Sequence, residues 1–556
     1  MAKFVAVLVG LVLLVGPLAD VSSAASTLKE LTSGKGQRQQ ADELHDRLSI
    51  TSNTIEDAKA KSKQPTPGQH NHDQAKNQKI TINYETRWFR QLVDHFTWAN
   101  QDTWLQRYLI NKDNWCGPNC PILFYTGNEG DIEVFTNNTG WMWENAQQLH
   151  AMLVFAEHRF YGQSMPYKID PTLISPKQTK TLGYLSSEQA LADYAKLIYE
   201  LKHNIFDAKH SPVITLGGSY GGMLAAWMRM KYPNLVDGAL AGSAPILQFP
   251  GEYNCQDFNK IVTKDYEGYS SNCSRSIAKS WSTIRDYGAS RGSAGLSALG
   301  RHFNTCQPMK ANDTDLLLEM LNSIWVNMAM TDYANKATFL SDMPAHPIEH
   351  ACAHLKADPI DSGDEDLLAA ISRASQVYTN STGQNACLNI TDYVYDPMDV
   401  LWDFQSCTEM VMPICSDGIN DMFEPEPFNL TDFVQSCKIR WGVDTQVNKI
   451  KTLYGDKNLH SASNIIFSSC TRDPWSAGCP QESIDANQII VLKCPGAHHE
   501  DLRPSGPNDS DEMRQVRKQE LDTITNWIQK HYSNVRKFAR NETLVWASRR
   551  TDSSEN

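Results

Sequence analysis

A serine flanked by glycines is the residue whose setting most directly suggests chemistry in this chain. The segment Gly217–Gly222 follows the apolar run Val213–Leu216 and precedes the helix-forming stretch Met223–Met230, and Ser219 stands within it. Small neighbours permit a sharp turn between strand and helix that projects a hydroxyl from the sheet, where larger side chains would clash. Ser219 is therefore the candidate nucleophile.

Two downstream residues could activate this serine. A serine hydroxyl needs a base to take its proton, and the base needs an orienting carboxylate; in this setting they follow in the order Ser, Asp, His. Asp473 comes shortly after the predicted strand Asn464–Phe467, and His498 just after the predicted strand Ile489–Leu492. The sequence predicts a triad in which Asp473 orients His498, and His498 takes the proton of Ser219.

The residues alone leave alternatives at two of these positions. Asp473 precedes Pro474, and an Asp-Pro pair often forms a turn, so the aspartate could be only a turn cap. His499 follows His498 directly, so either histidine could be the base while the other packs. A GxSxG string by itself is weak, and it gains force from the strand before it, the helix after it and the later Asp and His.

Alternating strands and helices would have to position these residues. Short apolar runs at 121–125, 152–156 and 213–216 are separated by helix-like segments, notably 187–201. This alternation predicts an α/β fold with a mainly parallel sheet and helices on its faces.

Composition divides the chain further. Residues 1–25 have the layout of a secretory signal peptide; a membrane anchor is the alternative, but the apolar run is short and broken by Gly16 and Pro17. The next segment lacks aromatic residues from 26 to 79 and is predicted to be a flexible leader or propeptide, residues 26–80. The rest is predicted to comprise a first core segment (81–246), a helical cap insertion (247–378), a second core segment (379–532) and a poorly ordered C-terminal tail (533–556). The cap helices could also be packing elements remote from the site.

The cysteines and the glycosylation sequons are typical of a protein that is exported from the cytosol. The chain has thirteen cysteines, an odd number, so at least one stays unpaired; Cys116 with Cys120 and Cys470 with Cys479 are plausible local bridges. Because there is no CxxC spacing, a metal site is the weaker interpretation, and no cofactor is expected. N-glycosylation sequons occur at Asn137, Asn272, Asn312, Asn380, Asn389, Asn429, Asn508 and Asn541.

The net charge of the chain limits the kinds of molecule it is expected to bind. A formal charge of −13 argues against a nucleic-acid partner and fits an acidic, soluble hydrolase. No membrane span is expected after signal removal, and a homodimer is possible. The predicted location is the secretory pathway, either the lysosome or the outside of the cell.

Several motifs of this chain, in the order in which they occur, resemble those of the serine peptidase family of lysosomal Pro-Xaa carboxypeptidase and dipeptidyl peptidase II. The motifs, besides the Ser219 turn, are Asp94–Phe96, Tyr125–Gly130, Phe155–Arg159, Glu188–Asp193, Asp473–Trp475 and Gly496–His499. The resemblance implies an α/β-hydrolase core with a helical insertion and a triad of Ser219, Asp473 and His498, which favours His498 over His499 as the base.

Residues around the triad can be assigned roles. The oxyanion of the tetrahedral intermediate needs backbone hydrogen-bond donors. In proteins with a serine at such a turn, one donor is the N–H of the next residue, here Tyr220, and another comes from the loop after an earlier strand. That loop follows Tyr125, with Gly127 and Asn128 as the candidates, although it could also be a simple glycine turn. By resemblance, Met223, Met412 and Trp475 surround an apolar proline pocket. Without the resemblance, Met412 is at least as well explained as a core residue.

The chain also departs from the family near the acid. Ser469–Arg472 replaces an Asn-Gly pair before Asp473, and Ser476–Cys479 replaces a glycine run after Trp475. A bridge between Cys470 and Cys479 could fix this loop in place of glycine turns. Arg472 adds a cation beside the acid, which puts the pocket shape and the pH dependence in question.

The leading functional prediction is a serine exopeptidase that removes the C-terminal residue after a penultimate proline through an acyl-enzyme on Ser219. Its substrates would be peptides with that proline. The runner-up is a dipeptidyl peptidase II-like aminopeptidase that releases N-terminal Xaa-Pro, and the two differ in whether the closed end of the cleft binds a carboxylate or an ammonium. A non-catalytic binding protein with a hydrolase fold is a third option, but no triad member is missing, and an esterase or lipase is disfavoured by the resemblance.

Overall fold

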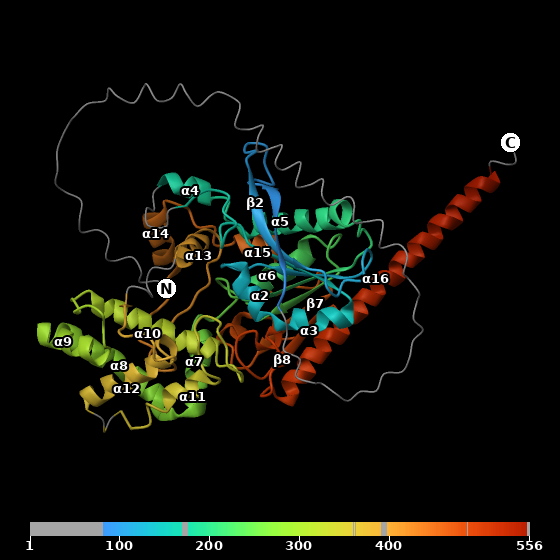
Figure 1. Ribbon diagram of the computed structural model, residues 1–556. Coiled ribbons are helices and arrows are strands. Elements are labelled where there is room, and N and C mark those ends of the chain that lie inside the picture. Colours follow the sequence, from blue (N-terminus) through green and yellow to red (C-terminus); the bar gives the residue numbers. More distant parts are fainter. Residues whose placement is uncertain are drawn as a thin grey trace, which may run out of the picture. The chain divides into compact units, whose positions relative to one another are not determined.

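The computed structural model describes residues 82–169, 176–359, 361, 363–390, 397–485 and 488–552. The predicted signal peptide (1–25) and leader (26–80) lie outside these residues. Within the described ranges, an eight-stranded sheet forms the centre of the molecule (Figure 1). Its order is β1-β2-β4-β3-β5-β6-β7-β8, with β1 Glu85–Leu92, β2 Thr103–Asn111, β3 Ile122–Thr126, β4 Met152–Ala156, β5 Val213–Gly218, β6 Gly238–Gly242, β7 Ile465–Cys470 and β8 Ile489–Cys494.

The sheet is mainly parallel. The six strands from β4 to β8 run parallel, and β2 is antiparallel to both β1 and β4. Residues of β3 to β7 are buried throughout, as expected for strands covered on both faces. The predicted α/β class is confirmed, and the strand order is that of an α/β-hydrolase core.

Helices cover both faces of this sheet. One face packs against α2 (Ile132–Asn138), α3 (Gly140–Leu149) and α16 (Asp511–Asp552). The other face packs against α5 (Ser187–Glu200), α6 (Ser219–Lys231) and α15 (Lys449–Tyr454). Each face thus has its own apolar cluster, and the nucleophile helix α6 belongs to the second.

A helical block lies between β6 and β7 in the sequence and has a separate apolar core. Six of its helices share one cluster of buried side chains and group together in Figure 1: α7 Asp257–Tyr269, α8 Ser271–Ala289, α9 Gly292–His302, α10 Asp313–Met330, α11 Pro347–Cys352 and α12 Asp364–Thr379. Two more helices, α13 (Pro397–Thr408) and α14 (Leu430–Trp441), pack instead with Phe160, Tyr161 and the end of α4 (Pro176–Leu182).

The C-terminal helix is longer than the sequence predicts. Met513, Val516, Ile524 and Ile528 are buried on the face that the periodicity indicates. The helix then continues to Asp552, past Tyr532, where the sequence predicts a poorly ordered tail.

Six disulfides join the described residues: Cys116–Cys120, Cys255–Cys415, Cys273–Cys352, Cys306–Cys387, Cys407–Cys437 and Cys470–Cys494. The predicted local bridge Cys116–Cys120 is confirmed. The predicted Cys470–Cys479 bridge is wrong, and Cys479 is free and buried. The reason is sheet register, since Cys470 and Cys494 are directly paired on the neighbouring strands β7 and β8 with their Cα atoms 4.3 Å apart.

Candidate active site

Ser219 lies at the junction between β5 and α6. It is the first residue of α6, directly after the last residue of β5, and its backbone has a φ of +57°. A non-glycine residue at positive φ is strained and is held there only by its surroundings, which is typical of a nucleophile at a tight turn. Ser219 is partly exposed, and no hydrogen bond joins its hydroxyl to another side chain of the described residues.

The glycines beside Ser219 leave room for two polar neighbours. A Cβ on Gly218 would lie 2.8 Å from the ring of His499, and one on Gly221 would lie 2.3 Å from Oδ1 of Asn128. Both contacts are closer than side chains tolerate. The turn therefore needs glycine on each side of the serine to bring the histidine loop and the β3 loop against it.

Asp473 and His498 are hydrogen-bonded to each other, with 2.9 Å between Oδ1 and Nδ1. Both are buried. The same Oδ1 accepts a 3.0 Å bond from the N–H of Trp475 at the start of the 3₁₀ helix Pro474–Gly478, so Asp473 is both a turn cap and the partner of a histidine. The backbone of His498 is fixed by Met330 and Tyr333, through His498 N–H to the Met330 carbonyl (3.1 Å) and Tyr333 hydroxyl to the His498 carbonyl (3.1 Å).

This pairing determines the tautomer of the histidine. An ionised carboxylate only accepts hydrogen bonds, so Nδ1 of His498 carries a hydrogen and Nε2 of the neutral ring is free to accept one. That is the state a general base requires.

His499 has a different environment. Its ring contacts Phe339 (5.4 Å between ring centres) and His498 (4.4 Å), and it packs against Gly218. Burial, with the nearby charges of His498 and Arg503, holds the pKa of His499 well below its usual value. No hydrogen bond joins its ring to a carboxylate of the described residues. The geometry therefore favours His498 over His499 as the base.

The loop after β3 braces the turn. The side-chain amide of Asn128 donates a 2.7 Å hydrogen bond to the carbonyl of Gly218, and its oxygen accepts one of 2.8 Å from the Tyr125 hydroxyl. The N–H of Gly127 donates to the carbonyl of Ala156 at 3.0 Å. The expectation that Gly127 supplies an oxyanion donor is therefore wrong, because its N–H is already paired with the carbonyl at the end of the neighbouring strand β4. The N–H of Asn128 has no partner among the described residues.

The three predicted pocket residues lie in two places. Trp475 packs against the helical block, edge to face with Phe258 (4.9 Å between ring centres), and its ring centre is 6.3 Å from that of His498. Met223 is almost fully buried in the cluster between the sheet and α6, and Met412 packs against the same cluster. Of these three residues, Trp475 is the one whose ring lies near the predicted base in the part of the chain that the structure describes.

Arg472 binds the helical block. Its guanidinium lies 2.5 Å from Oδ2 of the buried Asp332 and also donates to the Asp332 carbonyl and the Tyr269 hydroxyl, at 3.2 Å each. In the same region burial raises the pKa of Asp265 to about 9. The loop that carries Asp473 is therefore tied to α7 and to the segment after α10.

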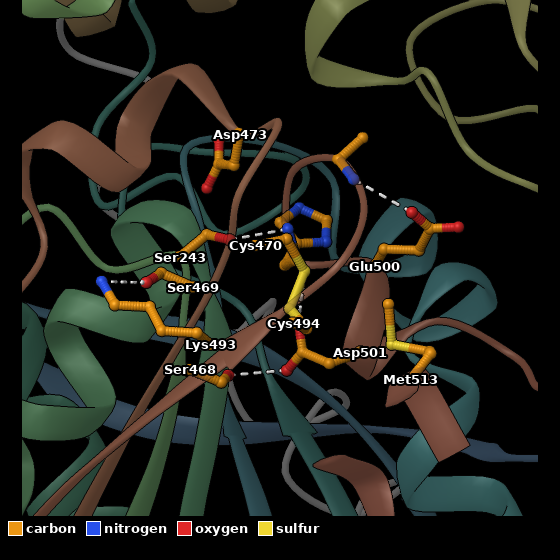
Figure 2. The surroundings of a disulfide bond; sticks show 12 residues. Ser243, Ser468, Ser469, Cys470, Asp473, Lys493, Cys494, Glu500, Asp501 and Met513 are labelled. Carbon is orange, nitrogen blue, oxygen red and sulfur yellow. Dashed lines mark hydrogen bonds between the residues drawn. A yellow bond between two sulfur atoms is a disulfide. The ribbon is translucent and has the colours of Figure 1, made fainter. Parts of the chain in front are cut away.

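Beneath the histidine loop lies a buried acidic group beside a disulfide (Figure 2). The Ser468 hydroxyl donates a 2.6 Å hydrogen bond to Asp501, which also lies close to both sulfurs of Cys470–Cys494. These two sulfurs and the Asp501 carboxylate are near enough to hold a metal ion, but the sulfurs are bonded to each other and offer no thiolate. Burial raises the pKa of Asp501 and of Glu520, and the charge of Asp501 raises that of Glu520 further, a coupling that no sequence motif indicates.

Surface features agree with the expected modifications. Of the predicted sequon asparagines, the seven whose side chains the structure describes are all at least partly exposed, and the side chain of Asn541 lies outside the described residues. No helix in the described ranges is both apolar and long enough for a transmembrane segment.

Comparison with known proteins adds a family. The model of the family described as "Serine carboxypeptidase S28" matches residues 91–520. Lysosomal Pro-X carboxypeptidase of Bos taurus is 45% identical over 461 residues, covering 83% of this chain and 91% of that protein, and the Homo sapiens protein is 44% identical over 459 residues, covering 82% and 91%. Thymus-specific serine protease of Homo sapiens is 25% identical over 463 residues, covering 79% and 86%.

Solved structures with similarity to the chain include two hydrolases. An epoxide hydrolase from Vigna radiata is 12% identical, with a TM-score of 0.31, and covers 80% of this chain and 98% of its own. A loop variant of haloalkane dehalogenase from Bradyrhizobium elkanii is 11% identical, with a TM-score of 0.33, and covers 82% and 99%.

Proposed function

Because the chain belongs to the serine carboxypeptidase S28 family, we propose that it removes the C-terminal residue that follows a penultimate proline in peptides. The family makes it a serine carboxypeptidase, and the proline specificity is what we propose. The observation that carries the proposal is the buried Asp473–His498 pair, which follows β7 and β8; the next residue, His499, packs against Gly218 beside Ser219. The names of the mammalian relatives, which cover more than four-fifths of this chain, support the specificity.

The proposed reaction begins with proton transfer. His498 Nε2 takes the proton of the Ser219 hydroxyl as Oγ attacks the carbonyl carbon of the penultimate proline. The tetrahedral oxyanion accepts hydrogen bonds from backbone N–H groups, of which those of Tyr220 and Asn128 are the candidates. Tyr220 is in the first turn of α6, where N–H groups have no partner within the helix.

The tetrahedral intermediate then collapses. His498 returns the proton to the leaving nitrogen, the C–N bond breaks, and the C-terminal amino acid leaves, so that the proline carbonyl remains esterified to Ser219. A water molecule next gives a proton to His498 and attacks the ester. His498 finally protonates Ser219, which releases the shortened peptide and restores the enzyme.

Aromatic and apolar side chains beside the triad support a site for proline. Trp475 packs near His498 and against the helical block, with Phe258 in a T-shaped contact and the Met330 sulfur against its Nε1. A proline ring offers no N–H and gains from such packing. We assign Trp475 to the proline pocket, with Met223 and Met412 as supporting residues.

Six disulfides support passage through the secretory pathway, since such bonds form and persist in oxidising compartments. The lysosomal names of the relatives favour the lysosome as the destination. Secretion from the cell is the alternative.

Two blocked peptides test the specificity. The first is N-acylated and ends in Pro-Phe, and the second has a free N-terminal Xaa-Pro and an amidated C-terminus. We expect free phenylalanine from the first at pH 5, no dipeptide from the second, and neither product with Ser219→Ala. Release of Xaa-Pro from the second alone would instead place the chain with the dipeptidyl peptidases.

A further inference from the structure

The side chain of Tyr220, the residue after the nucleophile, is held by a buried hydrogen-bond network. Its hydroxyl lies 2.7 Å from Nε2 of Gln405 and 3.1 Å from Nε2 of His158. Gln405 in turn has its Oε1 3.1 Å from the hydroxyl of Tyr161 and its Nε2 3.2 Å from a carboxylate oxygen of Glu409. Tyr220 is 2% exposed, and His158, Tyr161 and Gln405 are not exposed at all.

The direction of each hydrogen bond in this network can be assigned. Nδ1 of His158 lies 2.7 Å from the carbonyl of Arg159, which only accepts, so Nδ1 carries the hydrogen and Nε2 accepts. The hydroxyl of Tyr220 therefore donates to His158 and accepts from the amide of Gln405. The burial that lowers the pKa of His158 to about 4 keeps its ring neutral, as this assignment requires.

Three segments of the chain meet at this tyrosine. Tyr220 is on α6, His158 follows β4, and Gln405 is on α13, outside the sheet. Trp402 on α13 also packs edge to face on the Tyr220 ring, with 5.2 Å between ring centres. A tyrosine ring is rigid, so fixing its hydroxyl and its face leaves the Cα atom and the adjoining peptide group little freedom.

We propose that Gln405 is a positioning residue for catalysis: by holding the hydroxyl of Tyr220 it fixes the backbone N–H of Tyr220 at the oxyanion. The inference rests on the proposed function, in which that N–H stabilises the tetrahedral intermediate. The preceding residue, Ser219, has a strained backbone at positive φ, and such a conformation persists only when neighbouring contacts hold it. The hydrogen bond from Gln405 to the Tyr220 hydroxyl is one such contact. Loss of one oxyanion donor costs about 10²- to 10³-fold in kcat, and a displaced donor should cost a fraction of that.

The simpler reading is that the network only satisfies buried polar groups. On that reading, breaking it would lower stability without a selective effect on the tetrahedral intermediate. The two readings separate when kcat, KM and the capture of a tetrahedral adduct are measured on the same variants.

The test uses Gln405→Met, which keeps the volume but removes the donor, and Tyr220→Phe, which removes only the hydroxyl. Each is assayed in the full chain for cleavage of the N-acylated Pro-Phe peptide, and for the second-order rate of Ser219 modification by a fluorophosphonate. We expect kcat and the modification rate to fall about 10- to 100-fold in both variants, with KM within about twofold. The double variant should be no worse than the poorer single one, because both changes remove the same restraint.

Tyr454→Phe is the matched control, because it also removes a buried tyrosine hydroxyl, here one bonded to Ser187 at 3.1 Å, away from the nucleophile. It should keep both rates. If Gln405→Met and Tyr220→Phe keep kcat and the modification rate within about twofold of the wild type, or if only KM rises, the inference is wrong. The fluorophosphonate arm does not depend on proline specificity, so a wild-type enzyme that fails on Pro-Phe peptides but is modified at Ser219 refutes the proposed substrate and still decides the role of Gln405.

Discussion

Replacing Glu520 with glutamine should flatten the dependence of stability on pH. Glu520 on α16 and Asp501 beneath the histidine loop are both fully buried. Burial raises the pKa of both, and the neighbouring charge of Asp501 raises that of Glu520 further, well above its usual value. The folded protein therefore keeps a proton on this pair at pH values where the unfolded chain has lost it.

The direction and size of the change in the free energy of unfolding with pH follow from the linkage between proton binding and folding. A carboxyl group whose pKa is raised by folding stabilises the folded state most at pH values below its unfolded pKa, about 4.3 for glutamate, and the stabilisation is lost as pH rises toward the folded pKa. One extra bound proton in the folded state lowers the free energy of unfolding by about 1.4 kcal/mol for each pH unit. This slope applies over the pH range in which the folded protein holds the extra proton.

Glutamine at position 520 stays neutral at any pH, so the variant has no raised pKa at this position. Urea unfolding of Glu520→Gln at pH 5, 6 and 7 should show a free energy of unfolding that declines less steeply than that of the wild type, by up to about 1.4 kcal/mol per pH unit. Glu267→Gln, an exposed change on α7, is the control and should parallel the wild type. Parallel curves for Glu520→Gln and the wild type would refute the raised pKa of Glu520.

Three further substitutions test the site and the fold. Asp473→Asn should lower kcat about 10⁴-fold with little effect on KM, measured on the Pro-Phe peptide, because the histidine loses its orienting carboxylate; a loss under tenfold would contradict the triad. Gly218→Ala should reduce activity at least about tenfold, because its Cβ would lie 2.8 Å from the ring of His499. Gly268→Ala, which has open space around its Cβ, should keep full activity in the same assay. Cys494→Ser should lower the free energy of unfolding by about 3 kcal/mol in denaturant titration, because it opens a disulfide of sequence separation 24. Cys479→Ser, at the free cysteine, should change it by less than about 1 kcal/mol. Equal effects would contradict the observed pairing.

The central strands could be predicted because they are short apolar runs, which a sheet covered on both faces requires. The run 152–156 matches β4, and the run 213–216 lies within β5. The sequence does not indicate β6, because Gly238–Gly242 has no β-branched or aromatic residue. β1 was missed because polar and apolar residues mix along an edge strand.

The candidate site was predictable where the chemistry depends on local sequence. Ser219 is marked by its glycines, and Asp473 and His498 by the strands before them. The Cys470–Cys494 bridge depends on strand register, which sequence spacing does not reveal. The restraint by Gln405 comes from a helix 185 residues beyond Tyr220, so no pattern along the chain could indicate it.

The central claim, a carboxypeptidase with Ser219 as its nucleophile, is tested most directly by mass spectrometry of one peptide with both ends free and a proline next to each terminal residue, such as Ala-Pro-Ala-Ala-Pro-Phe. The account predicts that the wild type at pH 5 removes only phenylalanine, and that Ser219→Ala leaves the peptide intact. Loss of the N-terminal Ala-Pro dipeptide, or loss of phenylalanine with Ser219→Ala, would contradict it.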